Sequence, residues 1–169
     1  MVGRLALLVI APVALSARGL AKTETDETGA TWKDGVGPYL EVSFVLVKST
    51  QSYPDAHRFA QRVSAELGLP LDLRGLIYDP THGLTWPRER SAEDPLYPFP
   101  CYVARGRNDE GRYISIERSD AYPSFKPGLF IVVAASGRPE DAQNALPSIK
   151  TKVPDAYVKT ELVYFGCMH

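Results

Sequence analysis

Two stretches of the chain repeat one pattern of apolar and polar positions. Phe44 to Val47 and Phe130 to Val133 are continuous apolar runs, which is typical of buried strands. Each run is followed at the same offset by an Asp-Ala pair, Asp55-Ala56 or Asp141-Ala142, that opens a helical pattern. The two segments therefore align without a gap, and they predict a duplicated strand–helix unit.

The first unit predicts a strand over Val42 to Lys48 and a helix over Pro54 to Leu67. Gly68 is expected to end this helix. After it, Leu69 to Leu73 alternates apolar with other residues, which predicts a half-buried returning strand that continues toward Tyr78. The helix has one apolar stripe with helical spacing, made of Ala56, Phe59, Ala60, Val63 and Leu67.

The second unit repeats this order. Leu129 to Ala135 is the predicted strand, and Ala156 to Phe165 is the predicted returning strand. Pro147 lies within the helical pattern between them and is expected to kink or shorten that helix. The helical stripe is Ala142, Ala145, Leu146 and Ile149.

An insert, residues 79–128, separates the units. Its first half is rich in proline and aromatic residues, which predicts irregular structure lying across the surface. In its second half, Cys101 to Arg105 and Arg112 to Arg118 flank a loop-forming segment, which predicts a β-hairpin.

These elements predict an α+β fold, a ferredoxin-like βαββαβ sandwich built from two βαβ-type repeats. Both helices would cover one face of a four-stranded antiparallel sheet. The inserted hairpin would extend the sheet or pack on its edge. Residues 39–169 would form a single domain, as their number allows.

The N-terminus predicts export. A short basic start, Met1 to Arg4, precedes an apolar run from Leu5 to Ala17, and small residues follow, as in a secretory signal peptide. Ala17 and Ala21 are the alternative cleavage points, giving a signal peptide of residues 1–21. No cysteine lies near them, which argues against a lipid anchor. Residues 22–38 are polar and predict a flexible leader, so a periplasmic or secreted location follows.

Charge and hydropathy narrow the range of partners. The formal net charge is −1, and cleavage after Ala21 would remove Arg4 and Arg18. A mildly acidic chain of mixed charge is no match for nucleic acid. No segment after the signal peptide is apolar enough to span a membrane. Oligomeric state is left open by the sequence.

The two cysteines, Cys101 and Cys167, are the only ones in the chain. In an exported protein an even pair favours a disulfide, and two buried thiols are the alternative. The bridge would close a loop of about 65 residues, worth about 4 kcal/mol in the chain-entropy model. Two cysteines and three scattered histidines lack the spacing of a metal site, so neither metal nor cofactor is expected.

No catalytic motif is present. Asp79 and His82 are three residues apart and could hydrogen-bond locally, but the sequence places no nucleophile beside them. Glu89, Glu93 and Asp94 could supply an acid and a base for sugar cleavage, although solvation in a charged loop is their ordinary explanation. We therefore expect a binding protein rather than an enzyme.

Aromatic and arginine side chains gather in the insert, and these residue types dominate protein interfaces. The alternative is that several of them cover the sheet face that the helices leave bare. The predicted binding residues are Trp86, Arg88, Arg90, Tyr97, Phe99, Tyr102 and Tyr113.

The duplicated units resemble the SPOR domain. The second resembles it in Phe130 to Ser136, Glu140 to Leu146 and Asp155 to Val158, and the first in Phe44 to Ser49 and the helix after it. The resemblance implies a small ferredoxin-like module of the bacterial envelope that binds peptidoglycan stripped of its stem peptides. It covers residues 39–79 and 126–165.

Three functional hypotheses follow. The first is a non-enzymatic SPOR-like protein that binds peptidoglycan glycan or another envelope component, with its recognition residues on the open sheet face. The second is a periplasmic immunity protein or inhibitor that blocks a toxin or cell-wall hydrolase with residues near Trp86 to Phe99. The third is a small periplasmic hydrolase, which requires His82 to meet an acid such as Glu89 in a cleft.

Overall fold

The computed structural model describes residues 39–93, 96–106, 109 and 111–164, together with the backbone of 24–25 and 31–32. The chain divides into two units, Met1–Gly37 and Pro38–His169. In the first unit, β1 (Glu24–Thr25) and β2 (Thr31–Trp32) pair antiparallel. The predicted signal peptide and the rest of the predicted leader lie outside the described residues. None of the helices in the described part of the chain is long and apolar enough to cross a membrane.

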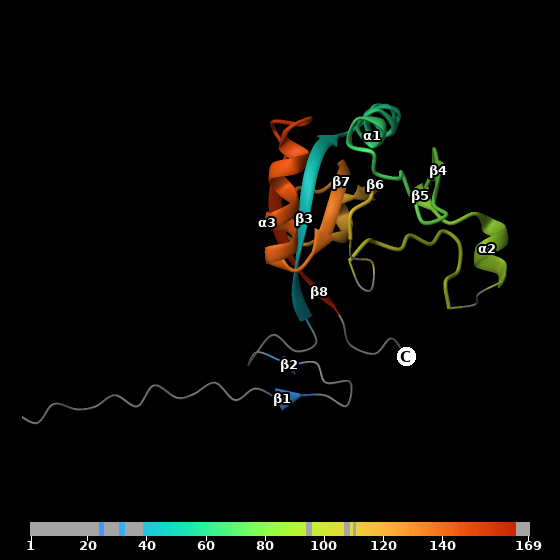
Figure 1. Cartoon of the computed structure of the whole chain (residues 1–169). Coiled ribbons are helices and arrows are strands. Elements are labelled where there is room, and N and C mark those ends of the chain that lie inside the picture. The colour runs from blue at the N-terminus through green and yellow to red at the C-terminus, as the bar shows by residue number, and fades with distance from the viewer. Residues whose placement is uncertain are drawn as a thin grey trace, which may run out of the picture. The chain divides into compact units, whose positions relative to one another are not determined.

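The second unit is a mixed α+β domain around a four-stranded sheet (Figure 1). The strand order is β6-β7-β3-β8, and all three neighbouring pairs are antiparallel. The α+β class predicted from the sequence is therefore confirmed. The strands are β3 (Tyr39–Thr50), β6 (Ser115–Arg118), β7 (Phe130–Gly137) and β8 (Tyr157–Tyr164), and the long helices are α1 (Tyr53–Leu67) and α3 (Pro139–Lys150).

Helix α1 forms where its periodicity predicts it. The hydroxyl of Ser52 caps the first turn by accepting the Asp55 N–H at 3.3 Å. Gly68 ends the helix in the left-handed conformation, with a φ of 64°. Of the predicted stripe, Ala56, Ala60 and Val63 are buried, and Phe59 and Leu67 pack at the margin of the same core.

We expect Gly68→Ala to lower the free energy of unfolding by about 1 kcal/mol, because a Cβ is strained in the left-handed conformation. The effect should come from the backbone alone, since an added Cβ would have no atom within 4 Å. Urea denaturation measures it, with Gln61→Ala on the exposed side of α1 as the control. Equal midpoints for the two variants would contradict the prediction.

Helix α3 matches the predicted second helix with one difference. It contains Pro147 and continues to Lys150, so the proline does not end it. The helix is nevertheless shorter than α1, at 12 residues against 15. Ala142, Ala145 and Ile149 of the predicted stripe are buried.

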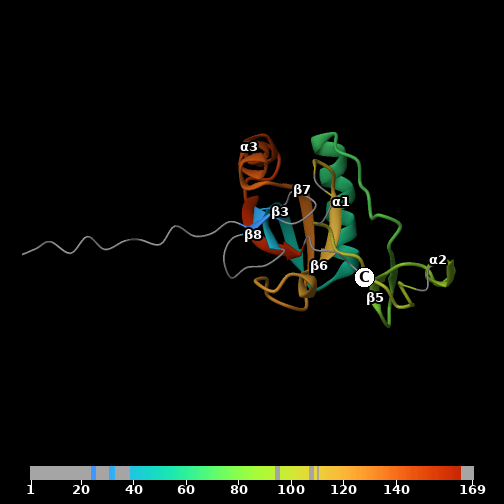
Figure 2. The ribbon, with the colours of Figure 1, turned by 90° about the horizontal axis from the view of Figure 1, so that it is seen from below.

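The sheet carries a core on each face. On one face, α1 packs against β3, β6 and β7, and α3 packs against β3, β7 and β8. The other face is covered by the segment after β6, which begins with the short helix η1 (Ser119–Ala121) and places Tyr122 and Phe125 over Phe44. Ser124 fastens this segment to β8, since its N–H binds Glu161 at 2.8 Å and its carbonyl accepts Lys159 at 2.6 Å. Figure 2 views these layers from below.

The predicted returning strand of the first unit is wrong. Residues 69–76 form only an isolated parallel bridge, Leu71 to Ile114, although Leu69, Leu71 and Leu73 do face the core. Pro70 has no N–H to give to a ladder. Arg74 and Gly75 then adopt positive φ angles of 55° and 75°, which turn the chain away.

Strand β6 takes that place in the sheet, so the predicted hairpin is also wrong. Residues 101–105 form no strand, and the predicted partner strand is reduced to Ser115–Arg118, which pairs with β7 from Ser115↔Val133 to Arg118↔Phe130. The insert therefore supplies an edge strand of the main sheet. Hydrogen bonds from side chains replace the expected ladder along residues 101–105, as described below.

The first half of the insert is more regular than predicted. Strands β4 (Ile77–Asp79) and β5 (Gly83–Thr85) pair as a small hairpin, and α2 (Arg88–Glu93) follows them. These elements extend beyond the β6 side of the sheet in both views (Figures 1 and 2). We refer to residues 77–100 as the arm.

Candidate functional site

The arm is fastened to the domain at its base. Leu84 is fully buried in the core under the helices. The Thr85 hydroxyl accepts the Cys101 N–H at 2.9 Å and lies 3.0 Å from the Cys101 carbonyl, which also accepts the Trp86 N–H at 2.7 Å. These bonds join the two ends of residues 86–100, so the rest of the arm extends from a fixed point.

Two arginine–aromatic stacks organise the arm. The guanidinium carbon of Arg90 lies 3.8 Å from the Trp86 ring centroid, and that of Arg88 lies 3.9 Å from the Phe99 ring centroid. The Tyr97 ring packs edge-on against Trp86 at 5.3 Å. Such contacts contribute about 0.5–1 kcal/mol each at exposed sites. Five of the predicted binding residues are thus brought together.

The outer surface of the arm is apolar and of mixed charge, since Glu89 and Glu93 are exposed on α2 as well. Arg88 and Arg90 are exposed, and the rings under them are half-buried. Leu96 precedes Tyr97 in the sequence, and its side chain is 81% exposed, the largest exposure among the large apolar residues described. Arginine and aromatic residues are enriched at protein interfaces.

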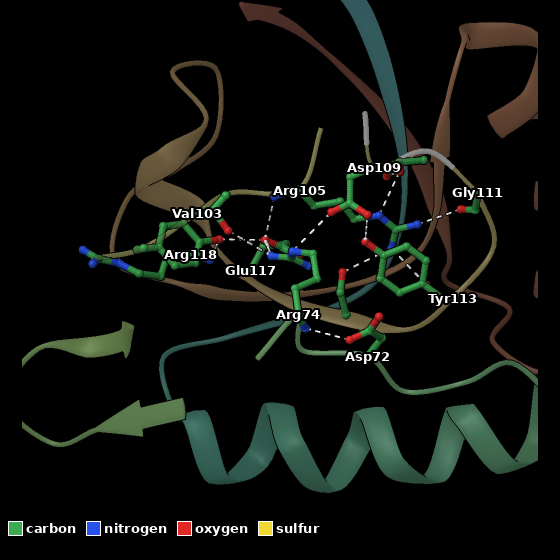
Figure 3. A network of polar contacts seen from close by, with 12 residues as sticks. Asp72, Arg74, Val103, Arg105, Asp109, Gly111, Tyr113, Glu117 and Arg118 are labelled. Atoms are coloured by element: carbon green, nitrogen blue, oxygen red, sulfur yellow. Dashed lines mark hydrogen bonds and ion pairs between the residues drawn. The ribbon is translucent and has the colours of Figure 1, made fainter. Parts of the chain in front are cut away.

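The remaining two predicted binding residues, Tyr102 and Tyr113, lie elsewhere. Both enter a polar network that joins residues 102–113 to β6, and Figure 3 shows most of its members. The Tyr102 hydroxyl donates to Glu117 at 2.7 Å and accepts the Arg118 N–H at 2.9 Å. The Tyr113 hydroxyl donates to Asp109 at 2.6 Å. Their positions make them part of the internal structure.

Glu117 is the centre of this network, and its side chain is 0% exposed. Arg74 binds it with two parallel hydrogen bonds, of 2.7 and 2.8 Å. The Tyr102 hydroxyl and the Arg105 N–H, the latter at 3.2 Å, bring the hydrogen bonds to this carboxylate to four. The network therefore fixes residues 101–105 to β6 through a side chain, where the hairpin ladder was predicted.

Arg105 is also buried, at 1% exposure. Its guanidinium donates to the carbonyls of Tyr113 at 2.9 Å and Gly111 at 2.7 Å, and to the hydroxyls of Ser115 at 3.1 Å and Ser136 at 2.8 Å. It also lies 3.6 Å from the Tyr113 ring centroid. The Arg105 side chain thus connects the segment before β6 to both β6 and β7.

The charged groups of the network neutralise one another, which is typical of a structural role. Burial alone would lower the pKa of Arg74, but the charge and hydrogen bonds of Glu117 raise it above its usual value. Arg74 also forms an ion pair with Asp109, with 3.2 Å between Nε and Oδ2. Burial and the nearby Glu117 charge raise the pKa of Tyr102, which therefore stays protonated and donates. Two guanidiniums thus balance two carboxylates.

Sequence reasoning missed Arg74 and Glu117, and it recognised Arg105 only as one arginine near aromatic residues. From the sequence, Glu117 in a short strand would be expected to face solvent. The signal that identifies it is long-range, since Arg74 lies 43 residues before its partner.

His82 makes the predicted local contact, with 3.0 Å between its Nδ1 and Asp79 Oδ1. The N–H groups of Thr81 and His82 hold the pKa of Asp79 below its usual value. The turn places the other side of the imidazole against the edge of Phe99, at 5.1 Å between centroids. Within the described residues no group of three His, Cys, Asp or Glu side chains could hold a metal ion.

The predicted disulfide stays a prediction. Cys101 is buried at the base of the arm, and Cys167 lies outside the described residues. A scan of protein-family profiles and searches of curated proteins and solved structures found no match to this chain.

Proposed function

We propose that this chain is a non-enzymatic exported protein that uses its arm to bind another protein, as an inhibitor or immunity protein does. The observation that carries the proposal is the Leu96 side chain, which is 81% exposed on the same arm as the two arginine–aromatic stacks. Burying such an apolar group against a partner is favourable, by about 1.5–3 kcal/mol for a complete side chain.

A rigid base makes the arm suited to this role. A loop that is already ordered loses less conformational entropy on binding than a free one. The bonds between Thr85 and Cys101, and the burial of Leu84, provide that order. The preferred partner is an enzyme with a cleft, such as a toxin or cell-wall hydrolase, which a projecting arm can enter.

Two exposed arginines of the arm suit such a partner. Arg88 and Arg90 are exposed cations on flat aromatic supports. Glycan-cleaving enzymes ordinarily carry two carboxylates in their clefts. Guanidiniums pair with carboxylates through two parallel hydrogen bonds, which would add specificity to the apolar contact of Leu96.

We also propose the ferredoxin-like arrangement for the domain, with β6 as its second strand. The order β8-β3-β7-β6 in an antiparallel sheet, with both long helices on one face, supports it. The SPOR resemblance, which predicts glycan binding on the open sheet face, remains the alternative proposal. We favour the protein partner because Tyr122 and Phe125 fill much of that face in this chain.

The proposal is tested by using the purified chain to capture partners from a periplasmic extract, beside co-sedimentation with peptidoglycan sacculi. We expect one stoichiometric protein partner, whose lytic activity falls when the chain is added. Leu96→Asp should weaken its binding about 30-fold, the effect of a 2 kcal/mol interface residue. No sedimentation with sacculi is expected.

The matched control is Leu162→Asp, which places the same charge at an apolar position of β8 that is 45% exposed. This variant should bind the partner as the parent chain does. Equal loss in both variants would contradict recognition by the arm. Sedimentation that rises when sacculi are stripped of stem peptides would favour the glycan alternative.

A further inference from the structure

The two edges of the main sheet differ in length. β6, at the edge from which the arm extends, has four residues, whereas β8, at the opposite edge, has eight (Figure 2). In the part of the chain that the structure describes, no strand pairs with the outer side of β8. A long edge strand of this kind is a place where a strand of another chain can add to the sheet.

The backbone groups on the outer side of β8 come from alternate residues. The Leu162 N–H donates to the neighbouring Glu161 carboxylate at 2.9 Å, so it is directed away from β3. Because backbone groups alternate in direction along an antiparallel strand, those of Val158 and Thr160 are directed outward as well. Those of Lys159 and Glu161 are directed toward β3.

The sequence of β8 is complementary to itself in the antiparallel direction. About a two-fold axis at Thr160, Lys159 of one copy lies opposite Glu161 of the second copy. Val158 lies opposite Leu162, and the two Thr160 residues face each other. Each pair thus matches in charge or in apolar character, as stable cross-strand pairs do.

The charges select this register among those that the backbone allows. An axis at Lys159 or at Glu161 also brings outward backbone groups together, but it places two ammonium groups or two carboxylates opposite each other, which is destabilising. With the axis at Thr160, Lys159 and Glu161 form non-hydrogen-bonded pairs, in which side chains are closest. Charged residues that ordinarily protect an edge strand from pairing therefore favour one arrangement here.

Both charged side chains can pair in this way and keep their bonds to Ser124. Glu161 accepts the Ser124 N–H with Oε2 and the Leu162 N–H with Oε1. Once the Leu162 N–H donates to the Val158 carbonyl of the second copy, Oε1 is available to Lys159 of that copy. The Lys159 ammonium has three N–H donors and already donates to the Ser124 carbonyl at 2.6 Å, so further donors remain.

We propose that two copies of this chain form a dimer by pairing their β8 strands antiparallel about Thr160. The pairing joins two four-stranded sheets into one, and every contact occurs twice, as in any two-fold interface. It also covers apolar surface, because the exposed Tyr157 and Leu162 come to lie opposite Val163 and Val158 of the second copy. Both arms extend from the opposite edges, so the dimer is independent of the proposed function.

Sedimentation equilibrium of the purified chain tests the dimer, and NMR of a mixture of isotope-labelled and unlabelled chains tests its register. We expect the mass to rise from one chain toward two as the concentration increases through the micromolar range. Isotope-filtered contacts should join the α-proton of Lys159 to that of Glu161 in the other copy, because α-protons face each other in a non-hydrogen-bonded pair. The mass of a single chain at every concentration, or contacts in another register, would overturn the proposal.

Thr160→Pro removes the outward N–H at the axis, and it should weaken dimerisation about tenfold or more because two hydrogen bonds between the copies are lost. Thr160→Ala is the matched control: it loses the same hydroxyl bond to Ser43 but keeps the N–H, so it should dimerise as the parent does. Equal loss in both variants would count against strand pairing.

The arm and edge variants separate this dimer from partner binding. Leu162→Asp places a charge opposite Val158 of the second copy, so it should weaken the dimer and leave binding of the protein partner unchanged. Leu96→Asp should do the reverse. Loss of the dimer in Leu96→Asp would mean that the arms, rather than β8, hold the copies together.

Discussion

Replacing Glu117 with alanine is expected to lower the free energy of unfolding by about 3–5 kcal/mol. The substitution leaves the Arg74 guanidinium buried without the carboxylate that accepts its two hydrogen bonds. It also removes the acceptor of the Tyr102 hydroxyl and of the Arg105 N–H. Urea denaturation followed by circular dichroism measures the loss.

Glu66→Ala is the control for this prediction. Glu66 pairs with Arg62 at 3.9 Å on the exposed side of α1, and such surface pairs contribute only about 0–1 kcal/mol. The double variant Arg74→Met with Glu117→Met should be more stable than Glu117→Ala, because the Arg74 guanidinium is then no longer buried without its carboxylate. If Glu117→Ala and Glu66→Ala cost the same, the buried network does not hold the insert.

Phe44→Ala is expected to cost about 3–5 kcal/mol, the usual range for a buried phenylalanine. Phe44 is 0% exposed at the centre of the sheet face opposite the helices. Tyr122 and Phe125 pack on it edge-on, at 5.0 and 6.3 Å between ring centroids. The cavity left by alanine would remove the main support of the segment that covers this face.

Thermal unfolding gives the measurement for Phe44→Ala, with a midpoint lowered by about 6 °C or more for a domain of this size. Tyr157→Ala is the control, since Tyr157 lies on β8 and is 49% exposed. It should lower the midpoint by no more than a few degrees. A similar small change for Phe44→Ala would mean that the covering segment is loosely packed, which would make the sheet face available to a glycan.

The elements that the sequence predicts correctly are those whose own residues show the apolar periodicity of a strand or a helix. The strands and helices of both repeats contain their own apolar pattern, so β3, α1, β7, α3 and β8 were predictable. The fourth strand was not. Leu69, Leu71 and Leu73 alternate like a strand and do face the core, yet Pro70 and the turn at Arg74 prevent a ladder.

For the candidate sites too, contacts between residues close in sequence were predictable, and contacts between distant residues were not. Trp86 and Arg90, and likewise Arg88 and Phe99, lie within one segment of the insert, and each pair stacks there. Tyr102 and Tyr113 belong to the same composition, but their hydroxyls find carboxylates in a network that depends on distant residues.

The fixed base of the arm has a consequence for how this protein can diverge. Thr85 and Cys101 hold the ends of residues 86–100 together, whatever lies between them. Closing a loop of twice the length costs only about 0.6 kcal/mol more. Insertions and deletions at the exposed positions of residues 87–100 are therefore inexpensive for the domain. A lineage of such proteins can change its recognition specificity there while the sheet, both helices and the buried network stay as they are.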